Sequence, residues 1–344
     1  MLALTLGAGL GSPTPILAED EADESAREEA AQAPATPPPT PITLGSVSYT
    51  DAKACFARLG YQAVFEPTTQ TLTLATTASE LVFRADSRDA RLNGLRVFLG
   101  EPALLHEGEL HLATLDIERF LLPILRPVRF KPRPLRTIVI DAGHGGNDTG
   151  TQNKKHKLEE KVYALDVARR LERLLAGERW RVLMTRTEDR FVALANRAEF
   201  ANKAEADLFI SIHFNAVANN AAVRGTETYV LTPQFQRSTS SLKASPEDKL
   251  AQPGNAHDAW SAVLGYHVHR QLLAALKSDD RGYKRARFAV LRLVDCPAVL
   301  VEAGYLSNND EAKRIADDDY RAELAAALYA AVQAYDALAS AAAQ

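Results

Sequence analysis

Apolar and polar positions alternate along short stretches of the chain between residues 46 and 127. The clearest runs are 60–65, 71–75 and 80–84. Successive residues of a strand point to opposite faces of a sheet, so this alternation predicts strands with one buried face. Helical spacing near residues 49–59 and 115–125 flanks these runs. We therefore predict a small α+β domain over residues 46–127.

Longer apolar runs alternate with helical patterns from about residue 135 to residue 338. Three of these runs are 137–140, 208–212 and 298–301. Strands that are buried on both faces of a parallel sheet have this composition, and their alternation with helices is typical of α/β domains. We predict an α/β domain over residues 135–338, with a mainly parallel sheet flanked by helices. Pro127, Pro132 and Pro134 mark the boundary before it.

Each of these three apolar runs leads into a residue that can bind a metal or move a proton. The first leads to His144 in a glycine-rich loop, the second to His213 and the third to Glu302. Ligands of such sheets bind beyond the carboxyl ends of the strands, so we expect these three side chains to share one crevice. The loop is neither a phosphate loop nor a dinucleotide fingerprint, because it lacks the Lys-Ser/Thr ending and the third glycine.

A fourth candidate lies in the first turn of the next predicted helix, whose apolar face contains Val162, Leu165, Ala168, Leu171 and Leu175. Glu159 and Glu160 both occupy this turn, where acidic side chains also complement the helix dipole. Position alone therefore assigns neither of them to a site. Two imidazoles and one carboxylate are nevertheless a known donor set for catalytic zinc. A further carboxylate must then carry the proton of the attacking water, and Glu302 is available for it.

Several motifs, taken in order, resemble the zinc-dependent N-acetylmuramoyl-L-alanine amidases of the type-3 class. The matching stretches are 138–146, 160–162, 185–187, 196–197, 201–202, 206–216 and 299–308. The resemblance covers about residues 136–336. It implies one Zn²⁺ ion held by His144, Glu160 and His213, with Glu302 as the catalytic glutamate. The implied reaction is hydrolysis of the amide between N-acetylmuramic acid and L-alanine in peptidoglycan.

The family pattern also decides between the two neighbouring glutamates, because its ligand directly precedes a lysine and Lys161 follows Glu160. Arg197 and Asn215 match recurrent family positions, and we expect both to support the site. Ala142 departs from the pattern, since proline is common there.

A polar insertion at residues 233–258, rich in serine, proline and glycine, is a second departure. Some relatives carry a self-blocking helix near this point, which an activator protein releases. The composition favours a mobile loop or lid over such a regulatory helix. The sequence leaves both autoinhibition and an activator protein as a partner open.

The first 45 residues predict export rather than a folded domain. Residues 1–18 have the apolar region and small-residue end of a secretory signal, although no positive charge precedes Arg27. A disordered tail is the alternative, and the missing charge suggests that the sequence begins inside the signal. Residues 19–45 are acidic and then proline-rich, which predicts an extended linker. We expect secretion to the periplasm or cell envelope. The 46–127 region weakly resembles the N-terminal domain named after copper amine oxidases.

Composition narrows the class of protein further. A formal net charge of −4 argues against nucleic-acid binding, and no apolar run is long enough to span a bilayer. Cys55 and Cys296 fall in different predicted domains, so we expect two unpaired thiols. Two other functions stay open: a zinc peptidase that cuts another amide, and a wall-binding protein without activity.

Overall fold

The computed structural model describes residues 38–343, so the predicted signal at 1–18 and most of the predicted linker lie outside the described residues. Residues Pro39–Gln344 group into one unit. The strand β1 (Ile42–Leu44) falls inside the range predicted as linker. The boundaries proposed above otherwise stay predictions.

Six strands form the sheet of the region after residue 135, in the order β13-β10-β14-β17-β15-β16. They are β10 (Thr137–Ala142), β13 (Arg181–Met184), β14 (Leu208–Asn215), β15 (Thr226–Leu231), β16 (Asp280–Ala286) and β17 (Ala298–Tyr305). Every neighbouring pair is parallel except β15 with β17. The predicted mainly parallel sheet is confirmed, and the three runs at 137–140, 208–212 and 298–301 are its central strands.

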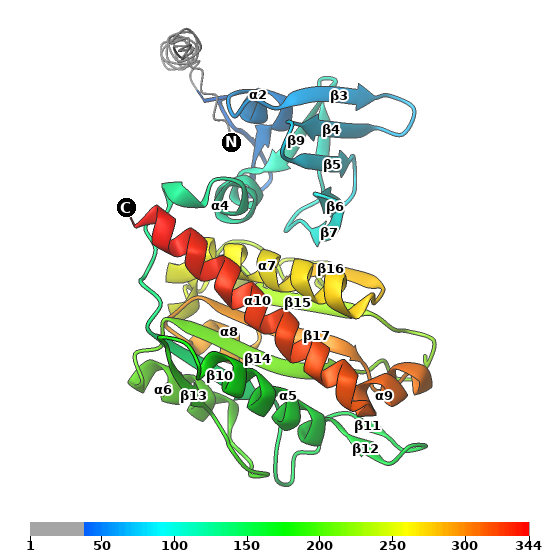
Figure 1. Ribbon diagram of the computed structural model, residues 1–344. Helices are drawn as coiled ribbons and strands as arrows, with labels where there is room; N and C mark the ends of the chain where they lie inside the picture. The colour runs from blue at the N-terminus through cyan, green and yellow to red at the C-terminus, as the bar shows by residue number, and fades with distance from the viewer. Residues whose placement is uncertain (1–37, 344) are drawn as a thin grey trace, which may run out of the picture. The chain divides into compact units, whose positions relative to one another are not determined.

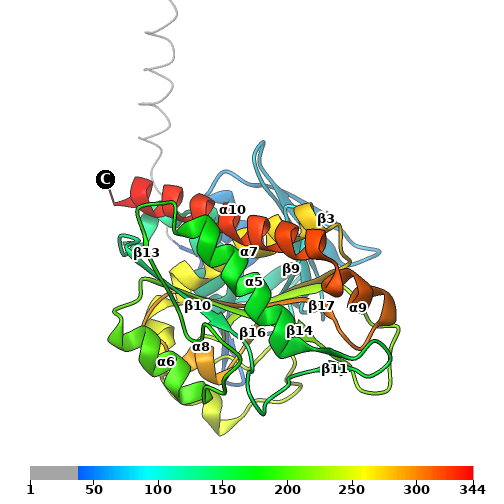
Figure 2. The same ribbon diagram turned by 60° about the horizontal axis from the view of Figure 1, so that its bottom comes forward.

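Helices cover both faces of this sheet (Figures 1 and 2). On one face, α10 (Asp318–Ala342) packs against α5 (Glu160–Leu175) and α7 (Asp258–Leu276), and α9 (Asn309–Ala316) precedes it. On the other, α6 (Leu194–Lys203) packs against α8 (Ala289–Leu293), which contacts β15 and β17. No helix among the described residues is long and apolar enough to cross a membrane.

The buried face of α5 differs from the predicted one at a single position. Leu165, Ala168, Leu171 and Leu175 are buried as expected, but Val162 is 52% exposed. The first turn of the helix instead buries Glu160. Val162 is two residues further along, about 200° around the helix, so its side chain points away from the core.

The region before residue 127 forms two antiparallel sheets. The strands β1, β2 (Val47–Asp51), β9 (Glu109–Ala113) and β8 (Leu104–His106) make one of them. The other is a meander of β3 (Gln62–Glu66), β4 (Thr71–Ala75), β5 (Glu80–Arg84), β6 (Asp89–Leu92) and β7 (Leu95–Phe98). Helix α2 spans only Ala52–Ala57, because the residues before it pair in β2 with β9. The second predicted helix is continuous from α3 (Thr114–Asp116) through a π-helical turn to α4 (Leu122–Leu125).

The meander joins the larger sheet edge to edge. Val97 on β7 pairs in parallel with Tyr283 on β16, which produces one sheet of 11 strands. Beside this junction, the buried carboxylate of Asp116 forms an ion pair with the buried guanidinium of Arg285. The backbone N–H of Gly100 also donates to Asp116, at 2.8 Å. Hydrogen bonds and a buried charge pair therefore attach the first region to the second.

The insertion at 233–258 contains no α-helix before α7 begins at Asp258, only two short 3₁₀ turns at Pro246–Lys249 and Pro253–His257. Arg88 anchors it, donating to the carbonyls of Ser238 at 3.1 Å and Ser241 at 2.9 Å. Arg237 within the insertion pairs with Glu101 at 2.7 Å. Arg88 and Glu101 of the first region therefore contact this segment, and its mobility stays a prediction.

Candidate metal centre

The loop after β10 presents His144 in an unusual backbone conformation. His144 has a φ of 59°, in the left-handed region that non-glycine residues rarely adopt. Two glycines make room for His144 and its two neighbours in the site. A Cβ at Gly143 would collide with the imidazole of His213, and one at Gly150 would lie 2.6 Å from the carboxylate of Glu160. Glycine at these positions lets the three side chains approach one another.

Two buried arginines hold this loop through hydrogen bonds to its backbone carbonyls. Arg197 donates to the carbonyl of His144 at 2.7 Å, and Arg186 donates to the carbonyl of Gly143 at 2.6 Å. Arg197 also pairs with the buried carboxylate of Asp141 at 2.8 Å. Burial alone would raise the pKa of Asp141, but the charge of Arg197 and a hydrogen bond from Thr185 lower it overall. These contacts agree with the expectation that Arg197 supports the site.

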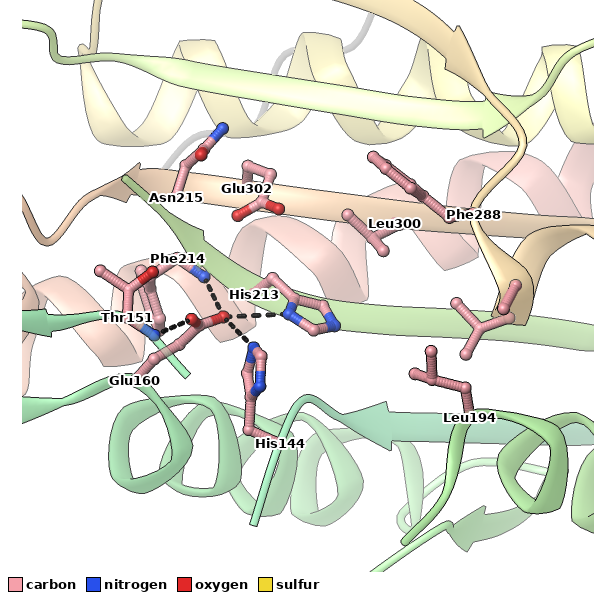
Figure 3. A pocket seen from close by; sticks show the side chains of 12 residues that line it. His144, Thr151, Glu160, Leu194, His213, Phe214, Asn215, Phe288, Leu300 and Glu302 are labelled. Atoms are coloured by element: carbon pink, nitrogen blue, oxygen red, sulfur yellow. Dashed lines mark hydrogen bonds and ion pairs between the residues drawn. The ribbon is translucent and has the colours of Figure 1, made fainter. Parts of the chain in front are cut away.

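His144, Glu160 and His213 come together at the carboxyl ends of β10 and β14 and the start of α5 (Figure 3). Glu160 Oε1 lies 3.1 Å from Nε2 of His144 and 2.9 Å from Nδ1 of His213. One potential ligand atom from each residue lies within 4.8 Å of the others. The three residues predicted to hold a metal therefore form one cluster.

Backbone and side-chain contacts fix the carboxylate of Glu160, which is only 2% exposed. It accepts hydrogen bonds from the N–H of Thr151 at 2.8 Å and of Phe214 at 3.0 Å. Burial would raise its pKa, but the hydrogen bonds from His144 and His213 hold the pKa far below its ordinary value. Glu160 is therefore an oriented anion.

The donor set fits a tetrahedral zinc ion. At zinc–ligand bonds of about 2.1 Å, tetrahedral donors lie roughly 3.4 Å apart, and Glu160 Oε1 lies at 3.1 and 2.9 Å from the two imidazole nitrogens. Asp148 accepts a hydrogen bond from Nδ1 of His144 at 2.9 Å, leaving Nε2 directed at the cluster. A carboxylate behind a ligating histidine is the usual way to orient the ring of a metal ligand. We had not predicted Asp148, although its spacing of four residues from His144 within a glycine-rich loop is a signal for it.

Glu302 lies on β17 directly opposite His213 on the neighbouring strand. Its Oε2 is buried and has no hydrogen-bond partner among the described residues. Burial, followed by the charges of Glu160 and Glu227, raises the pKa of Glu302 well above its ordinary value. A bound cation would act in the opposite direction and favour the carboxylate.

A pocket of about 300 Å³ opens onto these groups. Its lining residues are His144, Thr151, Glu160, Leu194, His213, Phe214, Asn215, Phe288, Ala289, Val290, Leu300 and Glu302. Figure 3 shows its two ends: the cluster and Glu302 lie toward Asn215, and the apolar side chains of Leu194, Phe288 and Leu300 lie beyond them. All four predicted site residues therefore face one cavity.

Asn215 connects the pocket to a charged group that we had not predicted. Asn215 donates to Oε2 of Glu227 at 3.0 Å and to the hydroxyl of Tyr305 at 3.3 Å. Glu227, on β15, lies opposite Glu302 and is almost completely buried. Nothing in its local sequence distinguishes Glu227 from a strand residue on a solvated face, so only strand pairing reveals it.

Cys55 and Cys296 are both free thiols, as predicted. Burial raises the pKa of Cys296 to about 12, which leaves it unreactive.

A mainly parallel sheet with a His–Glu–His cluster and an unpartnered glutamate at its strand ends is an arrangement suited to a single-metal hydrolase. Residues 138–334 match the N-acetylmuramoyl-L-alanine amidase family Amidase_3, so the chain belongs to that family. The match begins after the meander, and the resemblance of residues 46–127 to the copper amine oxidase domain stays a prediction.

Two curated proteins and one solved structure are similar to parts of this chain. The chain is 32% identical to the N-acetylmuramoyl-L-alanine amidase AmiC of Escherichia coli over 232 residues, covering 60% of this chain and 54% of AmiC. It is 31% identical to LytC of Bacillus subtilis over 199 residues, covering 58% of this chain and 35% of LytC. A crystal structure of an N-acetylmuramoyl-L-alanine amidase from Clostridium difficile has 31% identity and a TM-score of 0.49, covering 59% of this chain and 97% of that one. The chain thus spans about half the length of AmiC and a third of LytC.

Proposed function

We propose that this chain hydrolyses the amide between N-acetylmuramic acid and L-alanine in peptidoglycan, with one zinc ion held by His144, Glu160 and His213. The observation that carries the proposal is the cluster itself. Three fixed donors lie within 4.8 Å, opposite a glutamate whose buried oxygen has no partner. Membership of the amidase family supplies the bond to be cut.

Each residue of the site has a defined task. His144, Glu160 and His213 hold the ion, and Asp148 and the N–H groups of Thr151 and Phe214 keep two of them oriented. When bound, zinc supplies a positive charge that acidifies water and polarises the scissile carbonyl.

Glu302 moves the proton. Its unpartnered Oε2 accepts a proton from the water that adds to the carbonyl carbon, and returns it to the nitrogen of L-alanine as the C–N bond breaks. The products are a lactyl carboxylate on the sugar and a peptide with a free amino terminus. One carboxylate therefore serves first as base and then as acid.

The substrate also suggests where the protein works. Peptidoglycan lies outside the cytoplasmic membrane, so we propose a periplasmic or cell-envelope location for the chain. The secretory signal predicted at 1–18 supports this location. An activator protein as a partner stays a prediction, and the insertion forms no α-helix before α7 that such a partner could release.

Product identification on sacculi tests the reaction. The zinc-loaded full chain is expected to release stem peptides that begin with L-alanine and to leave the glycan strands intact, as read by mass spectrometry. Cleavage between two amino acids would instead support the zinc peptidase. Failure to retain zinc after loading and dialysis would support a wall-binding protein without activity.

Two variants assign the role of Glu302. Glu302→Gln should reduce turnover by at least about a hundredfold, as expected for loss of a general acid–base group, while zinc content stays at one ion per chain. Glu199→Gln is the matched control, because Glu199 forms only an exposed ion pair with Lys203 on α6. Full activity in Glu302→Gln would remove the proposed role.

A further inference from the structure

A second group of charges lies beside the pocket, centred on the buried carboxylate of Glu227. Lys284 Nζ lies 2.5 Å and Arg281 Nε 3.2 Å from the same oxygen, Oε1 of Glu227. The other oxygen, Oε2, accepts hydrogen bonds from Asn215 and from the hydroxyl of Tyr229. Glu227 is therefore saturated, and it is 3% exposed.

Two cations surround this single anion, so one positive charge is left over. The side chain of Arg281 is 35% exposed and that of Lys284 is 18% exposed, so both reach solvent above Glu227. Arg281 uses only its Nε, toward Glu227 and the hydroxyl of Tyr305. Its two terminal nitrogens have no hydrogen-bond partner among the described residues. A guanidinium with a free planar fork is suited to binding a carboxylate in bidentate fashion.

Aromatic rings hold both cations in position. The guanidinium of Arg281 lies 5.2 Å from the ring centroid of Tyr305, and Lys284 Nζ lies 5.4 Å from that of Phe98. Phe98 belongs to β7, so the meander contributes one wall of this group. Such contacts limit the motion of the two side chains and lower the entropy lost when an anion binds.

The group is continuous with the pocket. Asn215, which lines the pocket, and Arg281 share two partners, the carboxylate of Glu227 and the hydroxyl of Tyr305. Glu227 itself is the cross-strand neighbour of Glu302. Arg281 therefore lies next to the end of the pocket that Asn215 lines.

We propose that Arg281 and Lys284 form an anion subsite that binds the carboxylate of the residue following L-alanine in the stem peptide. The inference rests on the proposed function for the identity of the substrate. In peptidoglycan that residue is a glutamyl group, whose carboxylate is either free or converted to a carboxamide. The subsite selects the free carboxylate, because a neutral carboxamide cannot neutralise the surplus charge.

Neutralising Glu227 alone does not require this arrangement. Lys284 at 2.5 Å already balances the charge of Glu227, and Asn215 and Tyr229 satisfy its other oxygen. Arg281, which is partly exposed and has unused terminal donors, is not needed to neutralise Glu227.

The test compares two substrates that differ in one group: the γ-methylamide of N-acetylmuramoyl-L-alanyl-D-glutamate with its α-carboxylate free, and the same compound with the α-carboxylate also amidated. The zinc-loaded full chain should show a KM lower by on the order of tenfold for the free form, since a hydrogen bond to a charged group contributes about that much, with similar kcat. Arg281→Gln should abolish this difference by raising only the KM of the free form. Arg281→Lys should restore part of it.

Arg224→Gln is the matched control, because Arg224 forms an exposed ion pair with Asp279 outside this group. It should keep the full preference. Equal KM values for the two compounds in the wild-type chain, or an unchanged preference in Arg281→Gln, would overturn the subsite.

A binding measurement separates this inference from the proposed reaction. Calorimetry with the metal-free full chain should show tighter binding of the free-carboxylate compound, and Arg281→Gln should remove the difference. If the preference appears in binding but neither compound is cleaved, the proposed reaction fails and the subsite stands. If cleavage occurs and neither KM nor binding distinguishes the compounds, the subsite fails and the reaction stands.

Discussion

Arg197 offers the sharpest test of how the metal centre is supported. Its guanidinium is buried and makes hydrogen bonds to the carbonyls of Ala142, His144 and Val192 at 2.6, 2.7 and 2.9 Å. It also pairs with the buried carboxylate of Asp141 at 2.8 Å. Arg197→Met would remove all four contacts while keeping a long unbranched side chain.

The structure sets the expected magnitude. Removing one partner of a buried ion pair costs about 3–5 kcal/mol, because the other charge stays buried without compensation. Asp141 would keep hydrogen bonds only from the hydroxyls of Thr185 and Ser211. The carbonyl of His144, whose φ of 59° is unfavourable, would lose its anchor, and zinc affinity should fall by about 10- to 100-fold.

Urea unfolding of the metal-free chain measures the first effect, and zinc competition with a chelator measures the second. Asp141→Asn combined with Arg197→Met is the control, since the double variant leaves no buried charge and should recover part of the lost stability. A loss below about 1 kcal/mol, or strictly additive effects in the double variant, would refute the reasoning.

The dependence of stability on pH also tests the ion pair between Asp141 and Arg197. The pKa of folded Asp141 is below its ordinary value, so its contribution is present above the unfolded pKa, about 3.9, and disappears as the pH falls toward the folded pKa. Without Arg197, burial would raise that pKa instead. Measured as the difference from the wild-type chain at each pH, the stability of Arg197→Met should then fall as the pH rises from 4 to 7.

Three further predictions concern the ligands and the junction. Asp148→Asn should weaken zinc binding by about 10- to 100-fold in chelator competition, because His144 loses the carboxylate that orients it, and unchanged affinity would contradict this role. Burial lowers the pKa of His144, but Glu160 and Asp148 raise it overall. Protons should therefore displace zinc as the pH falls through that raised pKa, and metal release that does not depend on pH would contradict this. Asp116→Ala should destabilise the chain by about 3–5 kcal/mol in urea, because Arg285 is left buried and unpaired, and a loss below about 1 kcal/mol would argue against a strong junction.

Local patterns in the sequence were enough to predict the catalytic sheet. The runs at 137–140, 208–212 and 298–301 became its central parallel strands, because burial on both faces favours apolar side chains at nearly every position. The residues that follow these strands, His144, His213 and Glu302, could also be grouped from the sequence. Parallel strands in one sheet bring their carboxyl ends to a common edge, whatever their separation along the chain.

The same reasoning could not assign Glu160 to the site. Its position in a first helical turn also suits the helix dipole, and only family resemblance separated it from Glu159. The structure separates them physically. Glu160 is buried, with Thr151 and Phe214 donating to it, whereas the side chain of Glu159 is partly exposed.

Long-range contacts decided the features that local sequence patterns did not predict. The sequence by itself determined the three central strands, their parallel direction and three of the four residues at the edge of the sheet, since strand and helix periodicity are properties of neighbouring residues. Only the tertiary structure paired β7 with β16, buried Asp116 against Arg285 and anchored the insertion through Arg88. It also placed Arg281 and Lys284 beside the pocket. These contacts join residues far apart in the chain, and a charged side chain on a strand carries no local sign of whether its partner lies across a sheet or in water.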